Sequence, residues 1–140
     1  DTIVLVPLFG NEPLSSVVGD WYARETETLV ATAWCVTEFA SALGIKQRTG
    51  TLDAHLAQDA WNRFERLVAA DLQLLPVLPA HFQRAAALVL DPTHGLRAGD
   101  ALHLACAEAA GAQHLATLDD VLARNARRLQ IKLVAISGRT

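Results

Sequence analysis

Hydrophobic residues alternate along the chain between short apolar runs and longer stretches with helical spacing. The short runs, which contain β-branched residues, predict strands over residues 28–32, 72–77, 114–117 and 132–136. Hydrophobic positions three and four residues apart predict helices over residues 14–24, 34–48, 52–70 and 79–90. Because Pro7 is tolerated near a helix start, a further short helix is expected from Thr2 or Ile3 onward. Strands that alternate with helices predict an α/β domain with a mainly parallel sheet.

Residues 96–120 combine a helix that is apolar on nearly every side, a glycine, a short strand and a second helix start. A helix with this pattern is normally buried. Asp100 nevertheless lies in its first turn, where a carboxylate entering the interior is costly unless a positive charge meets it. Asp119 and Asp120 follow the strand directly. Acidic residues that converge from a buried helix and a strand end predict a cation site.

Four acidic residues are expected at the carboxyl ends of the strands, where parallel sheets bind their ligands. Asp1 would follow a first strand, Glu38 lies one turn into the helix after a strand, Asp100 begins a helix, and Asp119 follows a strand. Clustered carboxylates raise one another's pKa unless a cation lies among them. Oxygen ligands suit Mg²⁺ or Mn²⁺ better than Zn²⁺. This combination predicts metal-dependent phosphodiester chemistry with an activated water.

The length and composition are those of one globular domain. The 140 residues are 51% hydrophobic and 19% charged, with no disordered tract. Neither a secretory leader nor a membrane span is predicted, and Cys35 and Cys106 are expected as core residues in a reducing compartment, so a cytoplasmic location is expected. The formal net charge of −3 argues against a strong general affinity for nucleic acid, although local basic patches remain compatible with it.

Several short motifs, in this order and at this spacing, resemble those of the PIN-domain nucleases and, within them, the small VapC-like toxin ribonucleases. They are the opening Asp1-Thr2 with an apolar segment ending in Leu8-Phe9, TEFASAL at residues 37–43, LRAGDALHLA at 96–105, and TLD at 117–119. The resemblance covers essentially the whole chain, so residues 1–140 are expected to form a single PIN-like domain, a three-layer α/β/α sandwich. The family normally has a short strand before the first Asp, and the chain has no methionine, so a strand is expected to be missing before Asp1.

The resemblance implies an endoribonuclease that holds Mg²⁺ or Mn²⁺ with Asp1, Glu38, Asp100 and Asp119. It further implies a homodimer and a cognate antitoxin whose terminal segment blocks the acidic pocket. Thr2 and Thr117 are candidates for bonds to the carboxylates or to metal-bound water, and Arg97 is a candidate for contacting RNA phosphate.

Some assignments stay open at the level of single residues. Asp119 and Asp120 compete for one position: we expect Asp120 to begin the helix, which leaves Asp119 for the metal, although they could exchange roles. His103 can share a helix face with Asp100 and could bind metal, but a core histidine bonded to backbone is favoured. Thr51 is the expected cap of the helix over residues 52–70.

Other functions are also compatible with an acidic cluster on an α/β domain. A receiver-type phosphoacceptor needs a lysine at the far end of a late strand, and Lys132 begins its strand instead. A haloacid-dehalogenase phosphatase needs an acid two residues after Asp1, where Ile3 stands. A catalytically inactive PIN-like interaction module is the remaining alternative, against which the four acids argue.

Overall fold

The computed structural model describes residues 2–9 and 12–136. Its elements follow in the order α1 (Thr2–Phe9), α2 (Ser15–Arg24), β1 (Leu29–Thr32), α3 (Trp34–Arg48), α4 (Ala54–Ala70), β2 (Leu72–Leu75), α5 (Pro79–Leu90), the 3₁₀ turn η1 (Pro92–His94), α6 (Ala98–Ala109), β3 (His114–Leu115), α7 (Asp120–Arg128) and β4 (Lys132–Leu133). The expected strand before Asp1 falls outside these residues.

The described strands pair in parallel and form two small sheets. Strands β1 and β2 are joined from Leu29↔Leu72 to Thr32↔Leu75. Strands β3 and β4 are joined at His114↔Lys132 and Leu115↔Leu133. The predicted α/β class with parallel strands is therefore confirmed, while the single central sheet is replaced, among these residues, by two separate pairs.

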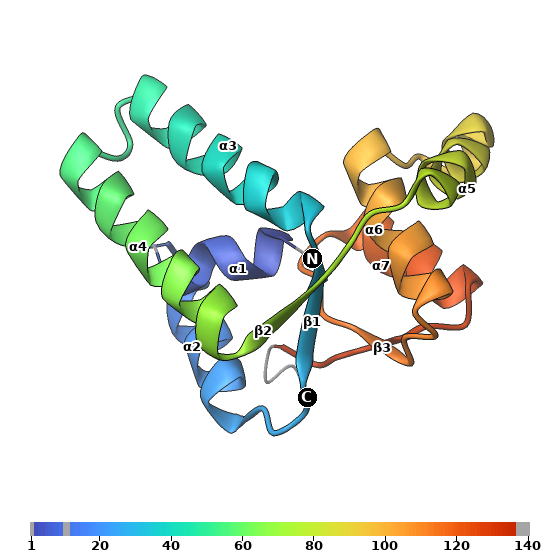
Figure 1. The fold of residues 1–140 in the computed structure, drawn as a ribbon, viewed down its shortest axis with the longest axis horizontal. Coiled ribbons are helices and arrows are strands. Elements are labelled where there is room, and N and C mark those ends of the chain that lie inside the picture. The colour runs from blue at the N-terminus through green and yellow to red at the C-terminus, as the bar shows by residue number, and fades with distance from the viewer. Residues whose placement is uncertain (1, 10–11, 137–140) are drawn as a thin grey trace.

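The strands lie in the middle of the molecule with helices on both sides (Figure 1). Helices α1 to α4 lie on one side and α5 to α7 on the other (Figure 1). Each parallel pair is joined by a helical crossover: α3 and α4 connect β1 to β2, and α7 connects β3 to β4. This arrangement brings the starts of α3, α6 and α7, which are far apart in the sequence, to the carboxyl ends of the strands.

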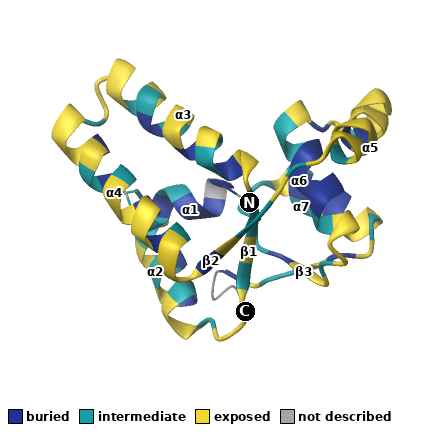
Figure 2. Cartoon of the chain, in the orientation of Figure 1, coloured by how far each residue is buried: buried dark blue, intermediate teal, exposed yellow. Residues whose placement is uncertain are grey.

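The hydrophobic core includes one cluster on each side of the strands. Phe39 of α3 stacks on Phe64 of α4 with ring centroids 4.2 Å apart, and Phe9 of α1 meets Phe39 edge-on at 5.5 Å. On the other side α6 is the central element, because six consecutive residues, 101–106, are buried (Figure 2). The prediction that this helix is buried on nearly every side is confirmed.

A largely apolar cavity of about 570 Å³ separates the two sheets. Residues 28–32, which include β1, line one side, and residues 112–116, which include β3, line the other. The buried indole of Trp21 also lines the cavity, and its Nε1 has no hydrogen-bond partner among the described residues.

The predicted helices and strands are found close to their expected positions, with one wrong cap. Helix α4 is capped by Asp53, whose side chain accepts a hydrogen bond from the backbone N–H of Leu56 at 2.8 Å. Thr51 instead belongs to the turn that ends α3, because its backbone N–H bonds to the carbonyl of Lys46 at 2.9 Å. Both cysteines are buried and free, as predicted. No helix in the described part of the chain is long and apolar enough to cross a membrane.

Candidate active site

Glu38 lies in the second turn of α3 and is held by hydrogen bonds from two other helices. The hydroxyl of Thr2, at the start of α1, donates to its Oε1 at 2.8 Å. Nε2 of His103, on α6, is bonded to the same oxygen. One oxygen of the carboxylate is thus occupied by protein donors, which fixes the direction in which the other oxygen points.

His103 is 5% exposed and extends the contact from Glu38 to β1. Its Nδ1 lies 3.2 Å from the hydroxyl of Thr32, the last residue of β1, which is also buried. The expectation that His103 bonds to backbone is wrong, because its ring is bonded to the side chains of Thr32 and Glu38. Thr32 was not predicted as a site residue. The signal that could have indicated it is a polar residue at the carboxyl end of an otherwise apolar strand.

The second oxygen of Glu38 faces the first turn of α6. A Cβ placed on Gly99 would lie 3.1 Å from Glu38 Oε2, so only glycine leaves this oxygen uncrowded. Asp100 is the next residue on α6 and is half-buried. The backbone N–H groups of a first helical turn carry partial positive charge, which favours carboxylates at this position.

Asp119 occupies the N-cap of α7. Its Oδ1 accepts a hydrogen bond from the backbone N–H of Leu122 at 2.7 Å, and its own N–H donates to the hydroxyl of Thr117 at 3.1 Å. Helix α7 begins at Asp120, as expected, and the residue before it, Asp119, supplies the capping side chain. Asp120 is exposed in the first turn of α7, whereas Asp119 is partly buried.

The pKa values of Asp100 and Glu38 are shifted in opposite directions by their surroundings. Burial raises the pKa of Asp100 above its usual value, the nearby Asp119 and Glu38 raise it further, and His103 and Arg97 oppose the rise. Burial also raises the pKa of Glu38, but the hydrogen bonds from His103 and Thr2 and the charge of His103 outweigh it, so the net shift is downward. Asp100 is therefore close enough to both Glu38 and Asp119 to be repelled by each of them.

The donor chemistry of this cluster fits a hard divalent cation, because Glu38, Asp100 and Asp119 offer only carboxylate oxygens and Gly99 leaves one of them open. The side chains are not gathered into a finished ligand cage, since no three His, Cys, Asp or Glu residues in the described ranges are placed to hold a metal ion. Asp1, the fourth predicted ligand, lies outside the described residues. Arg97 is exposed beside Asp100, at the N-cap of α6.

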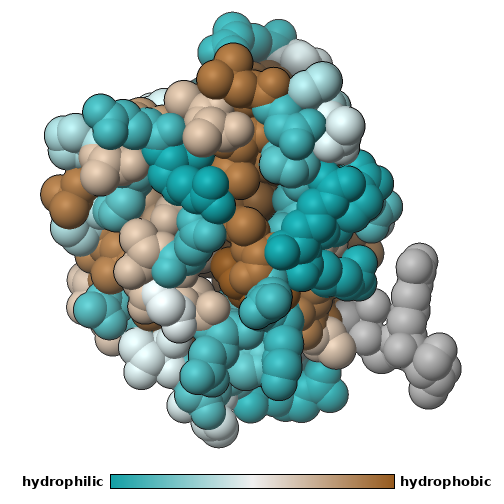
Figure 3. Space-filling view, turned by 90° about the vertical axis from the view of Figure 1, so that its right-hand side faces the viewer, coloured by the Kyte–Doolittle hydropathy of each residue, from teal (hydrophilic) through white to brown (hydrophobic). Residues whose placement is uncertain are grey.

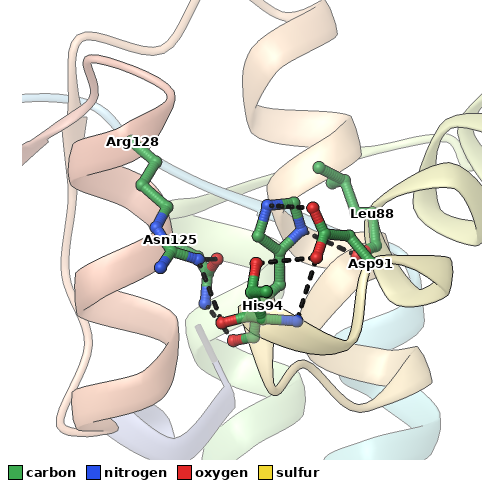
Figure 4. Close-up of polar contacts among 6 residues, drawn as sticks. Leu88, Asp91, His94, Asn125 and Arg128 are labelled. Carbon is green, nitrogen blue, oxygen red and sulfur yellow. Dashed lines mark hydrogen bonds and ion pairs between the residues drawn. The ribbon is translucent and has the colours of Figure 1, made fainter.

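The turn η1, which precedes α6, is fastened to α7 by a polar network (Figure 4). The side-chain amide of Asn125, which is 3% exposed, donates to the carbonyl of His94 at 2.8 Å. Nδ1 of the His94 ring lies 2.8 Å from the carbonyl of Leu88, and Arg128 reaches Asn125 at 3.1 Å. The network holds the turn that precedes Asp100 against the helix that Asp119 caps.

Comparison with known protein families matches residues 1–128 to the PIN domain. A search of curated proteins finds no significant match. The family match spans most of the chain and agrees with the parallel α/β arrangement. The chain therefore belongs to the PIN-domain family, a family of nucleases that typically use divalent metal ions.

Proposed function

We propose that this protein is an endoribonuclease that depends on Mg²⁺ or Mn²⁺ and hydrolyses RNA phosphodiester bonds. The observation that supports this most directly is that Glu38 of α3 faces the first turn of α6 at Gly99, and that the next residue, Asp100, is repelled by both Glu38 and Asp119. Acids gathered in this way are tolerated best when a cation neutralises them. Protein carboxylates together with a substrate phosphate form a common environment for Mg²⁺.

In this proposal Glu38, through Oε2, together with Asp100, Asp119 and Asp1 would hold the ion. A bound divalent ion lowers the pKa of water and neutralises charge on the phosphate. Arg97 is exposed next to the acids and would attract the RNA backbone, while its charge partly offsets that of Asp100. The hydroxyl of Thr2 would act indirectly, by donating to Oε1 of Glu38 and so orienting the carboxylate.

We further propose that the chain is the toxin of a toxin–antitoxin pair, that it forms a homodimer, and that a cognate antitoxin inhibits it. An acidic pocket attracts a cationic inhibitory segment, which gives such a complex its specificity. Helix α5 and its cap offer a surface for self-association, since Leu78, Phe82, Val89 and Leu90 are exposed there. Figure 3, seen from the side of α5 to α7, shows hydrophobic side chains gathered in a band between hydrophilic ones.

The nuclease proposal is tested by cleavage of a mixed RNA substrate with Mg²⁺, Mn²⁺ or EDTA. Wild type is expected to cleave only with the metal ion, and Asp100→Asn and Asp119→Asn are expected to lose at least a hundredfold in rate. Asp120→Asn is the matched control, because this exposed neighbour of Asp119 carries the same charge but lies outside the cluster. Equal cleavage by Asp100→Asn and wild type would refute the proposal.

An inactive interaction module is the second candidate. The observation that favours it is that the described carboxylates are not assembled into a ligand cage. Absence of cleavage by wild type on every RNA tested, together with a melting temperature that Mn²⁺ does not change, would favour this alternative.

A further inference from the structure

A buried polar bridge joins four elements at the edge of the acidic cluster. Thr32 of β1 contacts Nδ1 of His103, Nε2 of the same ring contacts Oε1 of Glu38, and Thr2 of α1 donates to that oxygen. Three of the four side chains are at most 6% exposed: Thr2, Thr32 and His103. The bridge therefore runs from the end of a strand, across α6, to one oxygen of a single carboxylate.

Packing alone does not explain this bridge. Polar side chains at such depth require hydrogen-bond partners that hydrophobic residues of similar size do not need, and replacing a buried ionic pair by apolar residues is often neutral or stabilising. His103 is the only polar residue in the buried run of α6 from 101 to 106, where its neighbours are Ala, Leu and Cys. Its placement is informative because it faces Glu38, a residue of the proposed site.

The bridge selects one orientation of the Glu38 carboxylate. Two donors occupy Oε1, so the carboxylate is held by one oxygen, while Oε2 stays on the side of Gly99 and the first turn of α6. Asp100 follows Gly99 directly, so the open oxygen faces the helical turn that carries the next acid. A glutamate without these donors would be free to rotate about its side-chain bonds.

We propose that His103 is a positioning residue, which holds Glu38 by Oε1 so that Oε2 is presented to a divalent cation. This inference rests on the proposed function, because it assigns His103 a part in the same metal site. His103 itself is not a ligand, since both ring nitrogens already face Thr32 and Glu38. Hydrogen-bond partners of metal-binding carboxylates commonly change metal affinity or activity by about 10- to 100-fold when they are removed.

The test measures Mn²⁺ binding to the whole protein by electron paramagnetic resonance, alongside melting temperature and RNA cleavage. His103→Leu removes the donor and is expected to weaken Mn²⁺ binding about tenfold or more, and to lower kcat while the KM for RNA stays within about twofold. His103→Gln keeps an amide donor near the position of Nε2 and is expected to recover most of the affinity.

Leu104→Ala is the matched control for lost stability. Leu104 is fully buried on the same helix. Leu104→Ala is expected to lower the stability of the protein more than His103→Leu does, and to leave the affinity for Mn²⁺ unchanged. If His103→Leu does not fold, Thr32→Val removes the hydroxyl that braces the ring and is expected to weaken Mn²⁺ binding several-fold.

The outcomes separate the two proposals. If His103→Leu binds Mn²⁺ as tightly as wild type, the positioning role is overturned and the nuclease proposal stays intact. The same holds for Thr32→Val if that variant has to be used instead. An equal loss of affinity in Leu104→Ala also overturns it, because the effect then follows stability. If wild type binds no Mn²⁺ and cleaves no RNA, the proposed function fails and the positioning role fails with it.

Discussion

Replacing Gly99 by alanine tests whether the contact between α6 and Glu38 serves the site rather than the fold. The added Cβ would lie 3.1 Å from Glu38 Oε2 and 3.4 Å from Trp34 Nε1. The contact with Oε2 is tighter than nine in ten natural Cβ contacts, so Glu38 must move by a few tenths of an ångström, whereas the contact with Trp34 is close to an ordinary van der Waals distance. The side chain of Glu38 is held at Oε1 by His103 and Thr2, so it moves only by straining those bonds.

The effect on stability is expected to be small because two contributions oppose each other. Alanine is favoured over glycine inside a helix by about 1 kcal/mol. Crowding at a packed contact costs about 1–3 kcal/mol, and here one neighbour is a carboxylate that can shift slightly. The melting temperature of Gly99→Ala is therefore expected to stay within roughly 5 °C of wild type.

The effect on activity is expected to be much larger than the effect on stability. A displaced Oε2 no longer lies where the cation needs it, and a small misplacement of a reacting or ligating group costs about tenfold or more in rate. We expect RNA cleavage with Mg²⁺ to fall about tenfold in Gly99→Ala, measured as kcat at saturating RNA.

Gly19→Ala is the matched control for this experiment. Gly19 lies inside α2, and a Cβ at that position meets nothing within 4 Å, so the variant is expected to gain about 0.5–1 kcal/mol with unchanged cleavage. The reasoning would be refuted if Gly99→Ala cleaved RNA as fast as wild type, or if its activity fell only in proportion to lost folded protein.

Two further predictions concern stability. Because folding raises the pKa of Asp100 and lowers that of Glu38, metal-free Asp100→Asn is expected to melt above wild type at pH 7 and Glu38→Gln below it. Both differences in melting temperature from wild type shrink as the pH falls through the range in which carboxyl groups protonate. Protonation removes the unfavourable charge of Asp100 and the favourable charge of Glu38 in the folded protein. Asn125→Ala leaves the carbonyl of His94 without its donor and is expected to cost about 2–3 kcal/mol in urea unfolding.

Each of these predictions has its own control. Asp120→Asn should not reproduce the melting temperature rise of Asp100→Asn, since Asp120 is exposed. Asn62→Ala, on the exposed face of α4, should cost less than about 0.5 kcal/mol. Matching results for test and control variants would contradict the corresponding prediction.

Local pattern was sufficient to predict most helices and the burial of α6. Five apolar or small residues accompany His103 in the run 101–106 and leave almost no polar face for solvent, so the helix has to lie inside. Helix α3 was predicted with its observed bounds, residues 34–48, because helical spacing ends there at a glycine and a threonine.

Features that depend on contacts across the fold were not predictable from local pattern. Thr51 and Asp53 are both good caps, and only the turn that bonds Thr51 to Lys46 decides in favour of Asp53. Helical periodicity indicated that His103 shares a face with Asp100, but not that Thr32 and Glu38 lie opposite its ring. Likewise, Asp119 and Asp120 are adjacent and carry the same side chain, and only the hydrogen bond from the backbone N–H of Leu122 identifies Asp119 as the cap.

The central claim is that Glu38, Asp100 and Asp119 share one divalent cation, and a crystal grown with Mn²⁺ tests it most directly. The account predicts an anomalous difference peak between these carboxylates, with Oε2 of Glu38 and oxygens of Asp100 and Asp119 within about 2.5 Å of the ion. A well-ordered crystal without a peak among these side chains, or with the only peak elsewhere on the protein, would contradict the account.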